Sequence, residues 1–357
     1  MYLHDSINPG AQSTDLNELL TAQQKKELNK KAATMAAAHL SAIGRERMTN
    51  CGEWLWMLEN HDGTRKKLEK GFFCGNRFCP ACAWRYAAGW GRALCTIDRY
   101  LEDGGMIPVF VTLTVPNVPA EQLRDQLRRM AAAWDKLIRR KKYHAWKNFV
   151  RKTEVTYNQE RNDYHPHYHV LTWVQPEYFH SGEYIRHSQL LSDWKAATGD
   201  SSIKHVRVQR CTSAAGTGAA VAEVAKYVAK SDDYLKNGQA VFDSFYDGLH
   251  GARIITLGGA AKTALTKYRN GDLLNYQPDK PDDLEQYTIR NIYHWHPFAE
   301  SYSLACSEYI DLAEESAQRE KAKQLIREDM AAMETELTES HEIIRCKTIM
   351  NSVQGVG

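Results

Sequence analysis

The sequence lacks an apolar run long enough to cross a membrane, for which a helix needs about 20 consecutive apolar residues. Its first ten residues, MYLHDSINPG, have neither the basic cluster nor the apolar stretch that is typical of a secretory signal peptide. We therefore expect a cytoplasmic protein without a membrane partner. In the reducing cytosol its eight cysteines would be free thiols or metal ligands, and not disulfides.

The chain also lacks a strong net charge, which is only +2 at pH 7, so net charge by itself does not indicate a nucleic-acid partner. The charges are unevenly spread, however. Residues 139–152 hold seven Lys and Arg and no acid, whereas residues 311–342 hold ten Asp and Glu against four Lys and Arg. This asymmetry predicts a basic working face and a separate acidic tail.

Runs rich in β-branched residues predict four strands, at residues 107–115, 149–158, 164–174 and 204–211. Apolar residues at helical spacing predict an amphipathic helix at residues 123–138, and an Ala-rich run predicts another at residues 217–230. Strands and helices in this order favour an α+β fold with a central antiparallel sheet flanked by helices.

Three cysteines, Cys74, Cys79 and Cys82, stand close together in the segment CGNRFCPAC. A Cys-x2-Cys pair with a third cysteine nearby is typical of zinc sites, because short loops turn several thiolates toward one tetrahedral ion. Buried small apolar cysteines are the alternative, which this clustering disfavours.

The fourth ligand follows from the segment WLWMLENHDGTRKKLEKGFF, which reads as a hairpin with Asp62-Gly63 at its turn. Such a hairpin places Cys51 opposite Cys74 at its open end. We therefore predict a four-cysteine zinc site, with His61 and Cys95 as weaker candidates for the fourth ligand. Four protein ligands close the coordination sphere, so this site would be structural.

The segment YHPHYHVL holds three histidines within five residues. Alternate residues of a strand share a face, so His167 and His169 project side by side, while His165 precedes a proline and lies in the lead-in to the strand. Glu154 on the preceding strand could add a carboxylate. Two imidazoles and a carboxylate with open water positions suit Mg²⁺ or Mn²⁺ acting as a Lewis acid. The alternative is a solvated strand end.

The Ala-rich helix carries Glu223 and Tyr227 four residues apart, and therefore on one face, with Lys230 three residues further on. A tyrosine oxygen can attack a phosphodiester and form a covalent intermediate. Glu223 could then accept a proton from a second nucleophile such as water or a 3′-hydroxyl. An exposed polar pair on a helix is the ordinary alternative.

Four segments occur in this order: CGNRFCPACAWR, FVTLTVPN, HPHYHVL and EVAKYVAKSDDY. Together they resemble the replication initiator (Rep) proteins of small rolling-circle plasmids, in the zinc-containing branch of the HUH endonuclease superfamily. The resemblance spans residues 51–234 and implies an HUH endonuclease fold with an N-terminal zinc-binding hairpin unit. The helical C-terminal tail lies outside the resemblance.

The resemblance implies that Tyr227 nicks one strand of origin DNA, keeps the 5′-phosphate and frees a 3′-hydroxyl primer for rolling-circle replication, with later rejoining. It implies that Glu223 acts in termination. DNA, a host helicase and a host polymerase would be partners. Tyr234 follows at seven residues and is expected to pack or to contact DNA. A single-strand transposase of the same chemistry, and a non-catalytic zinc-containing DNA-binding regulator, remain alternatives.

We divide the chain into five parts: a helical extension at 1–45, the zinc unit at 46–100, the catalytic domain at 101–250, an accessory α/β segment at 251–305 and an acidic helical tail at 306–357.

In residues 139–152, here called the basic segment, Lys and Arg are interleaved with aromatic residues. Its side chains could therefore bind phosphates and stack on bases. At least half of these side chains are expected instead to face water or to pack in the core. The predicted DNA contacts are Arg139, Arg140, Lys141, Lys142, Lys147, Arg151 and Lys152.

Overall fold

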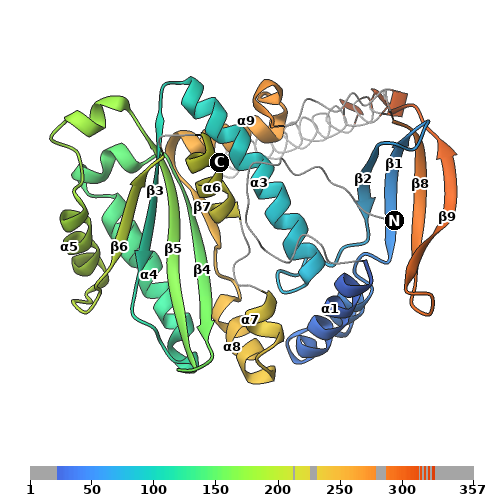
Figure 1. Cartoon of the computed structure of the whole chain (residues 1–357), viewed down its shortest axis with the longest axis horizontal. Coiled ribbons are helices and arrows are strands. Elements are labelled where there is room, and N and C mark those ends of the chain that lie inside the picture. The colour runs from blue at the N-terminus through green and yellow to red at the C-terminus, as the bar shows by residue number, and fades with distance from the viewer. Residues whose placement is uncertain are drawn as a thin grey trace, which may run out of the picture.

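The computed structural model of the chain describes residues 22–211, 214–225, 231–278 and 287–312, and part of residues 314–325. Two antiparallel sheets lie at opposite ends of the molecule, and helix α3 (Pro80–Asp103) runs between them (Figure 1). The strand order is β6-β3-β5-β4-β7 in the larger sheet and β2-β1-β8-β9 in the smaller one. The predicted α+β class, with antiparallel sheets flanked by helices, is confirmed.

The larger sheet contains all four predicted strands. Its members are β3 (Ile107–Thr114), β4 (Phe149–Asn158), β5 (Asp163–Val174), β6 (Val206–Arg210) and the short β7 (Ile255–Leu257). Strand β5 lies in the middle, and its residues from 166 to 174 are all buried. A strand covered on both faces needs apolar residues on both, which explains why the histidine motif runs on into a continuous apolar stretch.

Helices cover both faces of this sheet (Figure 1). On one face, α4 (Leu123–Ile138) and α5 (His187–Thr198) pack through Trp134 and Trp194 against alternate residues of the strands. On the other face, α3, α6 (Ala214–Ala225) and α9 (Gly259–Asn270) pack against Leu171 and Trp173. This second face carries the histidines.

The other helices that the structure describes lie outside these two layers or connect their elements. They are α1 (Ala22–Met35), η2 (Ala37–His39), α2 (Ala42–Thr49), η3 (Ala120–Gln122), η4 (Lys141–Trp146), η5 (Pro176–His180), α7 (Ser231–Leu235), α8 (Gln239–Leu249) and η6 (Leu274–Tyr276).

The smaller sheet joins distant parts of the chain. Strands β1 (Trp54–Asn60) and β2 (Lys66–Gly71) form the predicted hairpin, and β1 also pairs with β8 (Tyr287–His296), which pairs with β9 (Ser301–Tyr309). The hairpin turn is longer than the predicted two residues, since Asn60 donates a backbone hydrogen bond to Arg65 across it.

Strand β9 continues to Tyr309, so residues 306–309 are not helical, contrary to the prediction of a helical tail from residue 306. Pairing with β8 satisfies the backbone groups of this stretch, and charge composition alone does not reveal such a partner strand. Residues beyond 325 lie outside the described part of the chain.

None of the helices that the structure describes combines the length and apolar character needed to cross a membrane.

Candidate functional site: two candidate metal centres

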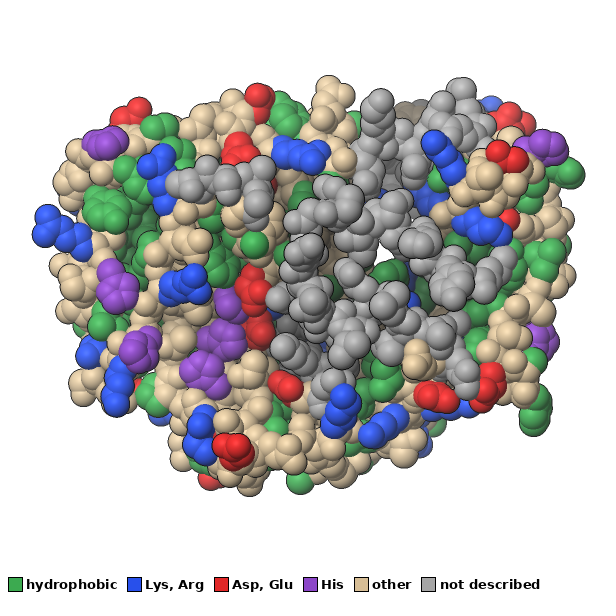
Figure 2. All heavy atoms as spheres, in the orientation of Figure 1, with side chains coloured by type: hydrophobic (Ala, Val, Ile, Leu, Met, Phe, Trp, Pro, Cys, Tyr) green, Lys and Arg blue, Asp and Glu red, His purple; other side chains and the backbone are tan. Residues whose placement is uncertain are grey.

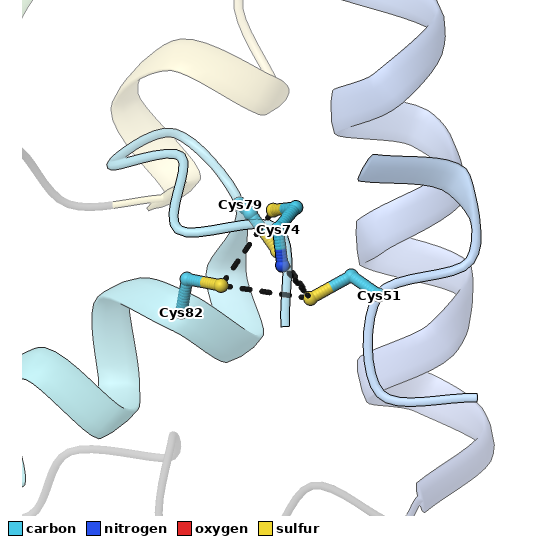
Figure 3. A group of neighbouring side chains, drawn as sticks. All are labelled: Cys51, Cys74, Cys79 and Cys82. Carbon is cyan, nitrogen blue, oxygen red and sulfur yellow. Dashed lines mark hydrogen bonds between the residues drawn. The ribbon is translucent and has the colours of Figure 1, made fainter. Parts of the chain in front are cut away.

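The four predicted cysteines converge at the base of the hairpin (Figure 3). Cys51 precedes β1, Cys74 follows β2, and Cys79 and Cys82 lie at the start of α3. The Sγ–Sγ distances are 3.4 Å from Cys79 to Cys51, 3.5 Å from Cys51 to Cys82 and 3.6 Å from Cys74 to Cys82. A tetrahedral zinc with Zn–S bonds of about 2.3 Å places its sulfurs about 3.8 Å apart, so the four thiols are spaced to fit one ion.

Backbone amides surround the sulfurs as they do around metal-bound thiolates. Gly75 N–H donates to Sγ of Cys82 over 3.2 Å, and Asn76 N–H donates to Sγ of Cys74 over 3.4 Å. Such donors stabilise the anionic form of a thiol. The weaker candidates His61 and Cys95 are not part of the cluster, because His61 lies in the hairpin turn and Cys95 lies further along α3, where it packs against the core.

The second candidate centre forms where β4 and β5 run side by side. Glu154 is paired with His167 across the two strands, and His169 lies two residues beyond on the same face. Ligand atoms of the three side chains all lie within 4.8 Å of one another. Figure 2 shows imidazole and carboxylate side chains side by side at the surface over these strands. The predicted grouping of Glu154, His167 and His169 is therefore present.

The hydrogen bonds of the two histidines leave nitrogen atoms available for a cation. Nδ1 of His167 lies 3.1 Å from the backbone carbonyl of His165, to which it can donate, so Nε2 keeps its lone pair. For His169 the nitrogen directed at the centre is Nε2, which lies 3.3 Å from Oε2 of Glu154 and 3.5 Å from Oε1 of Glu223. Its buried Nδ1 has no hydrogen-bond partner in the described part of the chain. His165 itself binds Asn117, with 2.8 Å between Nδ1 and Oδ1, and stays outside the cluster, as predicted.

The pKa values favour the charge states that bind a cation. Burial lowers the pKa of His167 to about 4, so its imidazole is neutral at pH 7. Burial by itself would raise the pKa of Glu154, but the hydrogen bond to His169 and the positive charge of Lys152 outweigh it and lower the pKa to about 2. A neutral imidazole and an ionised carboxylate match the preferences of Mg²⁺ or Mn²⁺.

Glu223 reaches this centre from α6. Its Oε1 lies 3.5 Å from Nε2 of His169, and its side chain is 30% exposed. Val221 and Val224 of the same helix are buried, so this helix packs its apolar side against the sheet. Tyr227 and Lys230 lie outside the described residues, so their predicted roles remain predictions.

Tyr234 is 2% exposed and packs between Phe78, Phe242 and Phe245. The ring is therefore part of the core formed with α8 and the start of the zinc unit's helix, in agreement with the prediction that Tyr234 packs.

The basic segment divides into exposed and buried residues. Arg139, Lys141, Lys142 and Lys147 are exposed, and Arg140 is half-buried. Arg140 and Lys142 form ion pairs with Asp193. The aromatic residues of the segment pack into the core beneath α4 and α5, on the face of the sheet opposite the histidines.

The prediction that Arg151 and Lys152 contact DNA is wrong. The guanidinium of Arg151 is buried against the rings of Trp134 and Tyr168. Lys152 is 0% exposed, and its Nζ donates to Oε2 of Glu154 over 3.0 Å and to the carbonyl of Glu223 over 3.1 Å. Strand alternation points these two neighbours into opposite layers, which a simple basic run does not reveal.

Sequence reasoning did not predict two further sets of contacts around the histidines. The ring of Phe110 on β3 stacks on His169, with 5.6 Å between centroids and 13° between planes. Asn117 donates to Asp163 over 2.7 Å while it holds His165. The Pro-Asn dipeptide directly after β3 was the available signal, because it marks the turn that ends this strand.

These features define an α+β protein with two candidate metal centres, one of four cysteines and one of two histidines and a carboxylate. The family model described as "Replication protein" matches residues 65–303, about two thirds of the chain. The chain therefore belongs to this family and is a plasmid replication initiator of the Rep type.

Relatives called "Protein rep" support this assignment. One from Staphylococcus aureus is 35% identical over 217 residues, which cover 60% of this chain and 94% of the relative. One from Streptococcus pneumoniae is 32% identical over 68% of this chain and 79% of the relative. One from Bacillus amyloliquefaciens is 29% identical over 77% of this chain and 92% of the relative. No solved structure matches the chain.

Proposed function

We propose that this replication initiator is a site-specific DNA nickase and strand transferase with the HUH endonuclease mechanism. The supporting observation is the meeting of Glu154, His167 and His169 with Glu223 of α6, four residues before Tyr227. A cation site for phosphate and a carboxylate for proton transfer then lie together, and the tyrosine follows that carboxylate by four residues in the sequence. A protein that only binds DNA has no need for this arrangement.

Each residue of the site has a separate role in the proposed nicking reaction. A bound Mg²⁺ or Mn²⁺ would polarise the scissile phosphate and orient it. The phenol oxygen of Tyr227 attacks the phosphorus, forms a 5′-phosphotyrosine bond and releases the 3′-oxygen as the leaving group. Glu223 accepts the proton of a later nucleophile, a 3′-hydroxyl or water, in rejoining or termination. Lys230 is proposed to stabilise the negative charge of the phosphate.

The four-cysteine site is proposed to hold a structural zinc that fixes the hairpin to α3. Of the five-part division, the helical extension at 1–45, the zinc unit at 46–100 and the catalytic domain at 101–250 are kept as a proposal, whereas strand β9 moves the start of the acidic tail beyond Tyr309. The smaller sheet adds that strands from the zinc unit and from residues 287–309 form one structural unit. DNA would be the main partner, and a host helicase and polymerase would extend the freed 3′-end.

The test is a covalent adduct assay. The full chain is incubated with Mn²⁺ or Mg²⁺ and a supercoiled plasmid that carries the origin next to its own gene, and the products are separated under denaturing conditions. Wild type is expected to form a protein–5′-DNA adduct together with relaxed plasmid. Tyr227→Phe is expected to form neither, because the attacking oxygen is absent.

The control variant is Tyr157→Phe, which removes a hydroxyl that donates to Asn162 and keeps the half-buried ring, on the face of β4 opposite to that of Glu154. It is expected to form the adduct at the wild-type rate. A wild-type protein that binds the origin but forms no adduct with either metal would favour the non-catalytic regulator. An undiminished adduct in Tyr227→Phe would place the nucleophile elsewhere.

A further inference from the structure

Lys152 is the least exposed basic side chain among the residues that the structure describes. An ammonium group taken out of water is costly unless it is paired and hydrogen-bonded, so its partners account for its position. They come from two different elements. Oε2 of Glu154 on β4 lies 3.0 Å from Nζ, and the backbone carbonyl of Glu223 on α6 lies 3.1 Å from it.

We propose that Lys152 is a positioning residue that ties the cation-binding carboxylate of Glu154 to the backbone of α6, and so sets the distance between the cation site and the residues that carry out the chemistry. This inference rests on the proposed function, because the distance matters only if these residues act on DNA. Two of its tests, cation affinity and hydrogen exchange, do not require that function.

The hydrogen bond from Lys152 to α6 reaches the backbone of a residue that lies close in sequence to Tyr227. The carbonyl of Glu223 belongs to the last described turn of α6, which runs to Ala225. Tyr227 follows Glu223 by four residues in the sequence. Lys152 therefore holds the backbone of α6 at a residue that is close in sequence to the proposed nucleophile.

The tie to Glu154 has an electrostatic consequence. Oε2 of Glu154 accepts from Lys152 over 3.0 Å and lies 3.3 Å from Nε2 of His169. The ammonium offsets the charge of the one carboxylate among the three candidate ligands, so it weakens the attraction for a divalent cation. Lys152 thus lowers cation affinity while it improves the alignment of the site.

Lys152 is thus proposed to lower cation affinity and to raise the reaction rate. This combination distinguishes a positioning residue from one that only supports the fold. Removing a residue that only supports the fold would loosen the site and weaken cation binding. Removing Lys152 as proposed would strengthen cation binding and, at saturating cation, slow the reaction.

The experiment uses the full chain with zinc retained. Lys152→Met keeps most of the side-chain length and removes both the charge and the donor, whereas Lys152→Gln removes the charge and keeps a donor for the carbonyl of Glu223. Lys262→Met on α9 is the control, since Lys262 is exposed on the outer side of that helix. Folding is checked by circular dichroism and zinc content.

Two readouts need no DNA. Mn²⁺ affinity, measured by electron paramagnetic resonance, is expected to rise about tenfold in both Lys152 variants and to stay unchanged in Lys262→Met. Amide hydrogen exchange without divalent cation is expected to speed up about tenfold at residues 220–227 in Lys152→Met, and by less in Lys152→Gln.

A third readout is the adduct rate at saturating Mn²⁺. It is expected to fall about a hundredfold in Lys152→Met and less in Lys152→Gln, as is typical when reacting groups are misplaced. Unchanged exchange and unchanged Mn²⁺ affinity in a folded Lys152→Met protein would overturn the inference. If Lys152→Met does not fold, the same two measurements on Lys152→Gln decide it.

Failure of the proposed function looks different. A wild-type chain that never forms an adduct would overturn the nickase proposal, while the exchange and Mn²⁺ measurements would still support or overturn the tie between Lys152, Glu154 and α6.

Discussion

Nε2 of His169 lies 3.3 Å from Oε2 of Glu154, although the two residues belong to different strands and are fifteen positions apart. The antiparallel register of β4 and β5 creates this contact, because it aligns Glu154 with His167 and Lys152 with His169. The register thus brings Glu154, His167 and His169 together in a buried position. The effect of this burial on the pKa of His167 can be tested by unfolding at different pH values.

We expect the free energy of unfolding, measured without added Mg²⁺ or Mn²⁺, to fall between pH 7 and pH 4. Burial lowers the pKa of His167 to about 4 from an ordinary value of 6.5, so in this interval the unfolded chain binds a proton that the folded chain does not. The difference corresponds to about 3 kcal/mol. Urea unfolding of wild type and His167→Gln at several pH values measures it. Equal pH slopes for both proteins would contradict the prediction.

We expect Cys79→Ser to lose zinc and to unfold the hairpin unit. Cys79 is 0% exposed at the centre of the cluster, and a structural zinc site contributes folding energy that is lost with one ligand. Atomic absorption should give about one zinc per chain in wild type and much less in the variant. Limited proteolysis should then cleave within residues 51–82. Cys306→Ser is the control, because Cys306 is exposed on β9 and outside the cluster. A full zinc content in Cys79→Ser would exclude this ligand.

We expect the exposed basic residues to set part of the salt dependence of DNA binding. Each lost phosphate contact lowers the slope of log affinity against log salt by about 0.7 to 0.9. Replacing Arg139, Lys141 and Lys147 together by Gln should therefore lower the slope by about 2, as measured by fluorescence anisotropy of labelled origin DNA. The matched control is Lys262→Gln. An unchanged slope in the triple variant would show that DNA does not contact this layer.

We expect Tyr234 to matter for stability and not for chemistry. Tyr234→Phe keeps the ring among Phe78, Phe242 and Phe245, so it should form the adduct normally and lose at most about 1 kcal/mol. Tyr234→Ala empties a core position and should cost about 3 to 5 kcal/mol in chemical unfolding. Loss of the adduct in a folded Tyr234→Phe protein would instead assign its hydroxyl a part in catalysis.

Much of the site was predictable because strands and short loops impose strict local geometry. A spacing of two residues puts His167 and His169 on one face wherever the strand lies. A Cys-x2-Cys pair likewise brings Cys79 and Cys82 together at the start of α3, and the hairpin brings Cys51 toward Cys74. These relationships depend on chain geometry over a few residues.

The basic segment shows where such reasoning fails. Arg151 and Lys152 are adjacent and equally charged, yet one packs against Trp134 and the other donates to Glu154. Strand alternation predicts that they face opposite ways, but only the helices packed on each face determine that neither side chain reaches solvent. Composition cannot separate these residues from the exposed Lys147.

The sequence by itself determined the local groupings of this protein: the cysteine cluster, the paired histidines, and the alternation of strands and helices. Only the tertiary structure decided which of these groupings meet. It paired β1 with β8 across more than 200 residues, buried Tyr234, and placed Lys152 between Glu154 and the carbonyl of Glu223. The physical reason is that local patterns fix which side chains share a face, whereas long-range packing fixes what that face contacts.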